Sequence, residues 1–85
     1  MEPEFVEFRS GQGETTAIGF ENENHQKCHG TLGVPGTDHR QLAYRMECLL
    51  CGNVYGANGS DVFQRLCPEC QGGRPSIRYW LVREH

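Results

Sequence analysis

The sequence has no long apolar run, which argues against two kinds of segment. No stretch approaches the roughly 20 apolar residues that a membrane-spanning helix needs. The first residues, Met1-Glu2-Pro3-Glu4, are acidic and lack the apolar stretch of a secretory signal. We therefore expect a cytoplasmic protein with no membrane partner, in a compartment that keeps cysteines reduced.

Apolar side chains are also scarce, at 36% of 85 residues, while glycine is frequent at 11. A chain of this size buries only about 60% of the surface that its unfolded form exposes, so its core is marginal. Domains this small usually need a metal, disulfides or a partner. The composition is neither low in complexity nor highly charged, so we expect order, in a single domain over residues 1–85.

No strong excess of positive charge is present, since the formal net charge is −3. Residues 1–38 carry seven acids and two bases, a balance of −5, and residues 39–85 carry six arginines and four acids, a balance of +2. This weakens a purely electrostatic case for nucleic acid. Six arginines without a lysine would still suit contacts with phosphates and base edges, because the planar guanidinium can donate two parallel hydrogen bonds.

Catalytic motifs are missing as well. No Ser-His-Asp set, phosphate loop or paired-carboxylate motif stands out, and no small-molecule substrate is evident. Asp38-His39 is similar to the metal-binding start of some small nucleases. Such a nuclease needs a further Asn and His on a following helix, and the only later histidine is His85. We therefore expect no enzymatic activity.

Four of the five cysteines form two pairs, Cys48-Leu-Leu-Cys51-Gly52 and Cys67-Pro-Glu-Cys70, with fifteen residues between them. An odd total argues against a complete disulfide framework, and this spacing is typical of zinc sites. Two tight turns can direct four thiolates to the corners of one tetrahedron, with Zn–S distances of about 2.3 Å. Because protein fills every position, we expect one structural zinc ion rather than a catalytic one.

These two knuckles resemble those of the zinc-ribbon family over about residues 46–73. The resemblance implies a metal but no single function, because zinc ribbons contact DNA, RNA or protein. The longer stretch 19–75 is similar to small, stand-alone bacterial zinc-ribbon proteins of unknown role, through segments 34–39 and 55–61.

The knuckles also look like rubredoxin-type iron sites, which share the aromatic residue that follows the first pair, here Tyr55. Sulfur-only tetrahedra accept zinc or iron. The iron alternative would imply one-electron transfer. We favour zinc, because the rest of the chain lacks the short, acidic, aromatic-cored shape of rubredoxins.

The residue pattern predicts a small β-rich fold, all-β or β with one short helix. We expect a zinc ribbon over about 41–73, an N-terminal β-hairpin region over about 5–34 and a C-terminal strand over about 76–83. Alternation and β-branched or aromatic residues predict the individual strands at 5–9, 15–20, 26–32, 41–47, 53–55 and 77–82.

Turn-forming residues predict a break at 33–38 and a tight turn at 56–59. Residues 61–66 fit a helix that places Val62, Phe63 and Leu66 on one face, and they fit a strand equally well.

Nucleic acid is our first expectation for the partner, and five arginines are the candidate contacts: Arg40, Arg45, Arg65, Arg74 and Arg78. Arg65 and Arg74 flank the second knuckle, so we expect them to be exposed. The alternative is a protein-interaction or scaffold subunit, which the acidic N-terminal half favours.

Two weaker features have competing interpretations. Tyr79 and Trp80 lie between Arg78 and Arg83, a combination that suits stacking on unpaired bases. We favour the alternative that Trp80 and Ile77 anchor the core, because a small core needs its one tryptophan.

The second weaker feature is a group of possible ligands in the predicted hairpin, His25, Cys28 and His29. With His39 or His85 they would complete a second metal site. We favour a polar, exposed loop, because only three such ligands are close in sequence.

Overall fold

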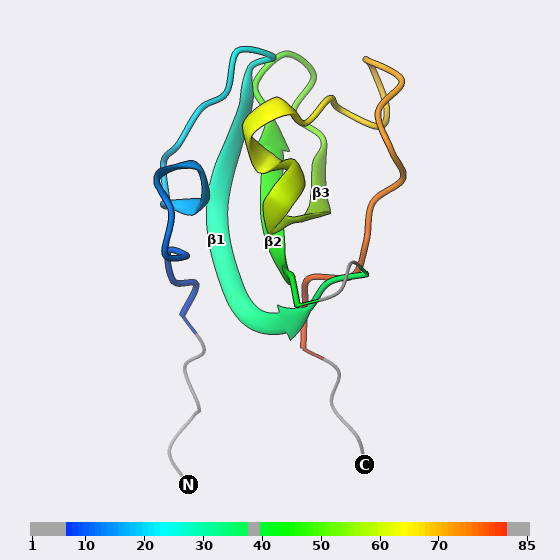
Figure 1. The fold of residues 1–85 in the computed structure, drawn as a ribbon. Helices are drawn as coiled ribbons and strands as arrows, with labels where there is room; N and C mark the ends of the chain where they lie inside the picture. Colours follow the sequence, from blue (N-terminus) through cyan, green and yellow to red (C-terminus); the bar gives the residue numbers. More distant parts are fainter. Residues whose placement is uncertain (1–6, 38–39, 82–85) are drawn as a thin grey trace, which may run out of the picture.

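The computed structural model describes residues 7–37 and 40–81. Three antiparallel strands form one sheet in the order β1-β2-β3: β1 (Gln26–Pro35), β2 (Leu42–Cys48) and β3 (Val54–Asn58) (Figure 1). Two short 3-10 helices, η1 (Glu14–Thr16) and η2 (Gly59–Gln64), complete the described elements. This arrangement confirms the β-rich fold class. Over the described residues, neither helix has the length or apolar content to cross a bilayer.

The central strand β2 sets the register of the sheet. Tyr44 lies opposite Thr31 of β1 and Ala57 of β3, and Met46 lies opposite Cys28 and Tyr55. Side chains alternate between the two faces of a strand, so Tyr44 and Met46 share a face while Arg45 lies on the other. The strand predicted at 41–47 is therefore confirmed with a shift of one residue.

Strand β1 is longer than predicted and strongly curved (Figure 1). Its pairing with β2 shifts register twice, between Cys28 and Thr31 and between Thr31 and Pro35. Gly30 and Gly33 take φ of 93° and 85°, which only glycine adopts readily. These irregularities bend the strand and let it continue, so the predicted break at 33–38 is wrong over 33–35.

The predicted N-terminal hairpin forms only in part. Residues 5 and 6 of the strand predicted at 5–9 lie outside the described residues, and Arg9 makes a single isolated bridge to Thr31. The strand predicted at 15–20 is wrong, because the Thr16 hydroxyl forms hydrogen bonds with the backbone of Gly13 and residues 14–16 form the helical turn η1 instead. The end of this segment still pairs with β1: the Gly19 N–H donates to the Cys28 carbonyl and the Cys28 N–H donates to the Phe20 carbonyl, each over 2.8 Å. An isolated bridge between Glu21 and Lys27 follows.

The predicted turn at 56–59 is also wrong over 56–58, where β3 continues to Asn58. Residues 59–64 then form η2, which decides the open choice at 61–66 in favour of a helix. Only Val62 of the predicted apolar face is buried, whereas Phe63 and Leu66 are exposed. A 3-10 helix has three residues per turn, so Val62 and Arg65 share the inward face.

The C-terminal strand predicted at about 76–83 is not formed over 76–81, its described part. The segment instead touches the free edge of β3 at one position. The N–H of Ile77 donates to the Gly56 carbonyl, and the N–H of Gly56 donates to the Ser76 hydroxyl. Any Cβ on Gly56 would collide with the Ile77 carbonyl, so glycine is required for this close approach.

The core lies between the sheet and η2, which Figure 1 shows in front of the strands. It comprises six buried residues, Cys28, Tyr44, Met46, Tyr55, Ala57 and Val62, with Phe20 packed against them. Trp80 is not among them, because 53% of its surface is exposed. The prediction that Trp80 anchors the core is therefore wrong, and two tyrosines supply the aromatic volume in its place.

A truncation at the centre of this core tests the packing. Met46 is completely buried, so Met46→Ala should lower the free energy of unfolding by about 2–5 kcal/mol, as lost contacts and a cavity add together. Leu50→Ala is the control, because 61% of Leu50 is exposed and its loss should change stability by less than about 0.5 kcal/mol. Urea unfolding of the two variants measures both, and equal effects would contradict the described core.

Candidate metal centre

The first knuckle begins where β2 ends. Cys48 closes the strand, and its backbone N–H donates to the Asn53 carbonyl over 2.8 Å. Its carbonyl accepts from the N–H of Gly52, also over 2.8 Å. Gly52 has φ of 79°, a conformation that costs other residues energy, so glycine ends this turn. The turn brings the sulfurs of Cys48 and Cys51 to the same side of the chain.

The second knuckle follows η2 and repeats this design. The Cys67 carbonyl accepts from the N–H groups of Gln71 (3.1 Å) and Gly73 (3.0 Å). Gly72 takes φ of 68° and again ends the turn. Two separate chain segments thus offer equivalent pairs of thiols.

The two knuckles meet. The sulfurs of Cys48 and Cys70 are 3.6 Å apart, as are those of Cys51 and Cys67. All four ligand atoms lie within 4.8 Å of one another. A tetrahedral centre with bonds of about 2.3 Å places its sulfurs about 3.8 Å apart. The four predicted ligands therefore fit one metal ion, and they are the only such group among residues 7–37 and 40–81.

Each knuckle contributes one buried and one exposed sulfur. Cys48 and Cys67, the first of each pair, are buried, while Cys51 and Cys70 face solvent. Both inner sulfurs receive hydrogen bonds. Cys67 Sγ accepts from the backbone N–H of Glu69 (3.3 Å) and of Cys70 (3.5 Å). Donors around the inner sulfurs spread the negative charge of a thiolate and hold its position.

These donors lower the pKa of the inner thiols. Desolvation raises the pKa of Cys48, but N–H groups outweigh it, led by the side chain of Gln26 and followed by the backbone of Cys51 and Leu50, and bring that pKa to about 6. The pKa of Cys67 is lowered in the same way: desolvation acts against its own backbone donors, and the donors prevail.

The outer thiols shift in the opposite direction. Desolvation and the neighbouring sulfurs raise the pKa of Cys70 to about 12. The Asn53 N–H lowers the pKa of Cys51, but desolvation and the nearby sulfurs overcome it and raise that pKa. Four adjacent thiolates repel one another, so complete ionisation of the cluster needs a cation at its centre.

A buried amide connects this cluster to the core. Gln26, at the start of β1, is completely buried. Its Nε2 donates to Cys48 Sγ over 3.3 Å, while its Oε1 accepts from the hydroxyl of Tyr55 over 2.7 Å. Burial raises the pKa of Tyr55, so the phenol stays protonated and can donate. The Tyr55 bond fixes the orientation of the amide and thereby aims its N–H at the sulfur.

A second amide extends the connection to the other knuckle. Gln26 Nε2 also donates to Gln71 Oε1 over 3.0 Å, and that oxygen accepts from the backbone N–H of Cys67 over 2.7 Å. One chain of hydrogen bonds therefore joins Tyr55 to both inner cysteines. Sequence reasoning missed Gln26 and Gln71. Strand alternation could have indicated that Gln26 is buried, because it places Gln26 on the same face as Cys28 and Lys27 on the other.

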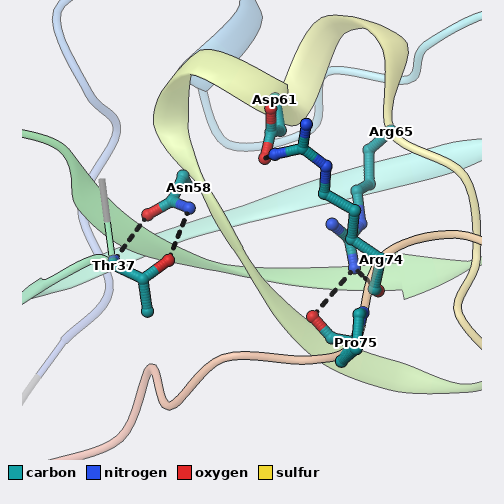
Figure 2. Close-up of polar contacts among 6 residues, drawn as sticks. All are labelled: Thr37, Asn58, Asp61, Arg65, Arg74 and Pro75. Carbon is teal, nitrogen blue, oxygen red and sulfur yellow. Dashed lines mark hydrogen bonds and ion pairs between the residues drawn. The ribbon is translucent and has the colours of Figure 1, made fainter.

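Arg65 fixes the segment that leaves the second knuckle. Only 5% of its surface is exposed, and its guanidinium lies 5.0 Å from the centre of the Tyr55 ring. Nη2 donates to the carbonyls of Arg74 and Pro75 (Figure 2). Asn22 binds the other side of this region, donating to the Arg65 carbonyl over 3.1 Å. The prediction that Arg65 is exposed is therefore wrong, because its charge is used inside the fold.

The other four candidate arginines lie closer to solvent. Arg40, Arg74 and Arg78 are exposed, and Arg45 is half-buried. Figure 2 shows Arg74 turned toward Asp61 of η2, with Nη1 and Oδ2 3.6 Å apart. Asn58, in the same view, binds Thr37.

Among the residues that the structure describes, the weaker metal ligands do not converge. Cys28 is buried in the core, where desolvation raises its pKa, and His29 Nε2 lies 2.8 Å from Glu47 Oε1. Both residues belong to β1, so the predicted exposed loop is wrong for them, while His25 is exposed in the preceding turn. The remaining candidates, Asp38, His39 and His85, lie outside the described residues.

No family model, curated protein or solved structure matches this chain. A functional assignment by similarity is therefore not available from these comparisons, and the geometry of the four cysteines carries the argument. Four cysteines in these positions can hold one metal ion.

Removing the buried amide should weaken metal binding. Gln26→Met keeps the volume but leaves Cys48 without its side-chain donor and the Tyr55 hydroxyl without its acceptor. Loss of such a ligand-supporting hydrogen bond typically lowers metal affinity by about 10- to 100-fold. Gln12→Met, at an exposed position, is the matched control. Zinc affinities from competition with a chromophoric chelator give the comparison, and equal values for both variants would refute the role of Gln26.

Proposed function

We propose that this chain is a non-enzymatic zinc-binding module of the zinc-ribbon type, which presents a surface to a macromolecular partner. The convergence of the four cysteine sulfurs, within 4.8 Å of one another, carries the proposal. Four protein ligands complete a tetrahedral shell and leave no position for water or substrate. The ion then acts as a structural staple.

Zinc is the proposed metal, and iron is the alternative that the same donors accept. The surrounding fold supports a structural role, since the network of Gln26 and Gln71 connects both knuckles to the core. An iron site would colour the purified protein red, whereas zinc leaves it colourless, so the two are told apart at once.

Nucleic acid is the proposed partner. The support is the group of arginines that the fold leaves near solvent: Arg40, Arg45, Arg74 and Arg78. Arg65 is not included, because its guanidinium donates hydrogen bonds to the backbone carbonyls of Arg74 and Pro75. Arg74 contributes less than a free cation, because Asp61 lies beside it.

A protein partner is the second candidate, and exposed apolar side chains favour it. Leu49 and Leu50 project from the first knuckle, and half of the Phe63 surface on η2 is accessible. Such residues serve as anchors in protein interfaces. Stoichiometric co-purification of one protein, together with no affinity for oligonucleotides, would select this function.

The metal prediction is one zinc ion per chain, measured by elemental analysis of native protein. Cys67→Ala should lose the ion and unfold, because binding to a structural site contributes about 10–16 kcal/mol of apparent free energy. Cys28→Ala is the matched control, since Cys28 lies in the core outside the cluster and should keep a full equivalent of zinc. A Cys67→Ala protein that retains both its zinc and its melting temperature would sink the proposal.

The partner prediction concerns salt dependence. The zinc-loaded protein should bind fluorescein-labelled DNA or RNA oligonucleotides, and the affinity should fall as salt rises. A slope of about −2 in log K against log [salt] is expected if three arginines neutralise phosphates of a single strand. Fluorescence anisotropy measures this, and the absence of any binding at about 50 mM salt would reject nucleic acid as the partner.

A further inference from the structure

Three aromatic rings from opposite ends of the chain meet outside the core. Phe8 and Tyr79 have ring centres 6.3 Å apart at an interplanar angle of 63°. Tyr79 and Trp80 follow at 5.3 Å and 90°. In an edge-to-face pair the edge of one ring lies against one face of the other, so each of the two pairs covers at most one ring face.

The last ring of this row is the most accessible. Trp80 is the only tryptophan of the chain, and its surface is more than half exposed. A tryptophan usually contributes large apolar burial, yet here Tyr44 and Tyr55 fill the core. An exposed tryptophan beside two further aromatic rings is therefore a candidate stacking surface.

Positive charge accompanies the rings. The guanidinium of Arg45 lies 5.7 Å from the centre of the Phe8 ring, and the exposed Arg78 immediately precedes Tyr79. Neither arginine forms an ion pair with a carboxylate of the described residues, whose two ion pairs involve His29 and Arg74. The nearest acids in sequence are Glu7, which precedes Phe8 and is exposed, and Glu47, which binds His29. Two unpaired cations beside open rings complement an anionic partner that carries flat groups.

The position of Arg45 locates this surface in the fold. Its neighbours Tyr44 and Met46 belong to the core, and strand alternation places Arg45 on the opposite face of β2. The surface therefore lies on the side of the sheet away from η2, which Figure 1 shows in front of the strands. The Asp61–Arg74 pair, by contrast, involves η2 itself (Figure 2).

We propose that Phe8, Tyr79 and Trp80, together with Arg45 and Arg78, form a binding site for single-stranded nucleic acid. Unpaired bases stack on the rings, and the two arginines contact the phosphates between them. A duplex does not fit this site, because its bases are already stacked on one another and expose no faces. The inference rests on nucleic acid as the proposed partner and adds which strand form binds, and where.

Trp80 itself reports on this binding. Stacking of a base on the indole should quench its emission, and no other tryptophan contributes to the signal. We expect saturable quenching of the zinc-loaded protein by short oligothymidylate or oligouridylate, the two arms separating DNA from RNA. A duplex of the same length should leave the emission unchanged. Binding of oligonucleotides without quenching would overturn the stacking site.

Substitutions then separate this inference from the proposed function. With labelled single strands, Trp80→Ala and Tyr79→Ala should each weaken binding about tenfold or more, while Trp80→Phe should retain most of the affinity. Arg45→Gln should reduce the salt slope. The matched control is Phe63→Ala, an exposed aromatic residue on η2, which should bind single strands like the native chain.

Two other outcomes are informative. If Arg74→Gln weakens binding and the aromatic variants do not, nucleic acid remains the partner but this site is wrong. If only duplexes bind, this site is wrong but nucleic acid remains the partner, and if neither single strands nor duplexes bind, both proposals fail. Zinc content and far-ultraviolet circular dichroism confirm that each variant folds, and the quenching of the native protein tests the site even where a variant does not.

Discussion

Four thiolates directed at one point repel one another, and this repulsion is the constraint on which the fold depends. The sulfurs come from two turns that lie fifteen residues apart in sequence, one at the end of β2 and one after η2. The pKa values of the thiols differ for this reason. Hydrogen-bond donors lower the pKa of the inner thiol Cys48, while burial and the neighbouring sulfurs raise the pKa of the outer thiol Cys70. A divalent cation bound at this point would neutralise the repulsion and join the two turns.

The relative magnitudes explain why so few apolar residues suffice. Burying a side chain such as Met46 or Val62 contributes about 1.5–3 kcal/mol, and the core contains only six residues. The proposed structural zinc would contribute about 10–16 kcal/mol, several times more than any side chain. The hydrogen bonds of Gln26 connect these two sources of stability, because they join the Tyr55 hydroxyl in the core to the Cys48 sulfur. The core and the metal centre are therefore expected to melt together.

Sequence reasoning recovered what depends on local pattern and missed what depends on long-range contacts. Cysteine spacing identified the four ligands, and alternation identified β2. The pattern could not reveal that Arg65 turns inward, because its partners are the carbonyls of Arg74 and Pro75, fixed only once the second knuckle has folded. At 15–20, the β propensity of the residues did not produce a strand, because the local hydrogen bonds of Thr16 favour a helical turn. The role of Trp80 was misjudged because the two core tyrosines lie on adjacent strands whose register cannot be read from composition.

In the proposed function, the metal stabilises the fold and the aromatic row on the face of the sheet opposite η2 binds the partner. The most direct test of the account is X-ray absorption at the zinc edge of the native protein. We predict a single shell of four sulfurs at about 2.3 Å, with no oxygen or nitrogen ligand. A shell with fewer than four sulfurs, or protein that folds without a stoichiometric metal, would contradict it.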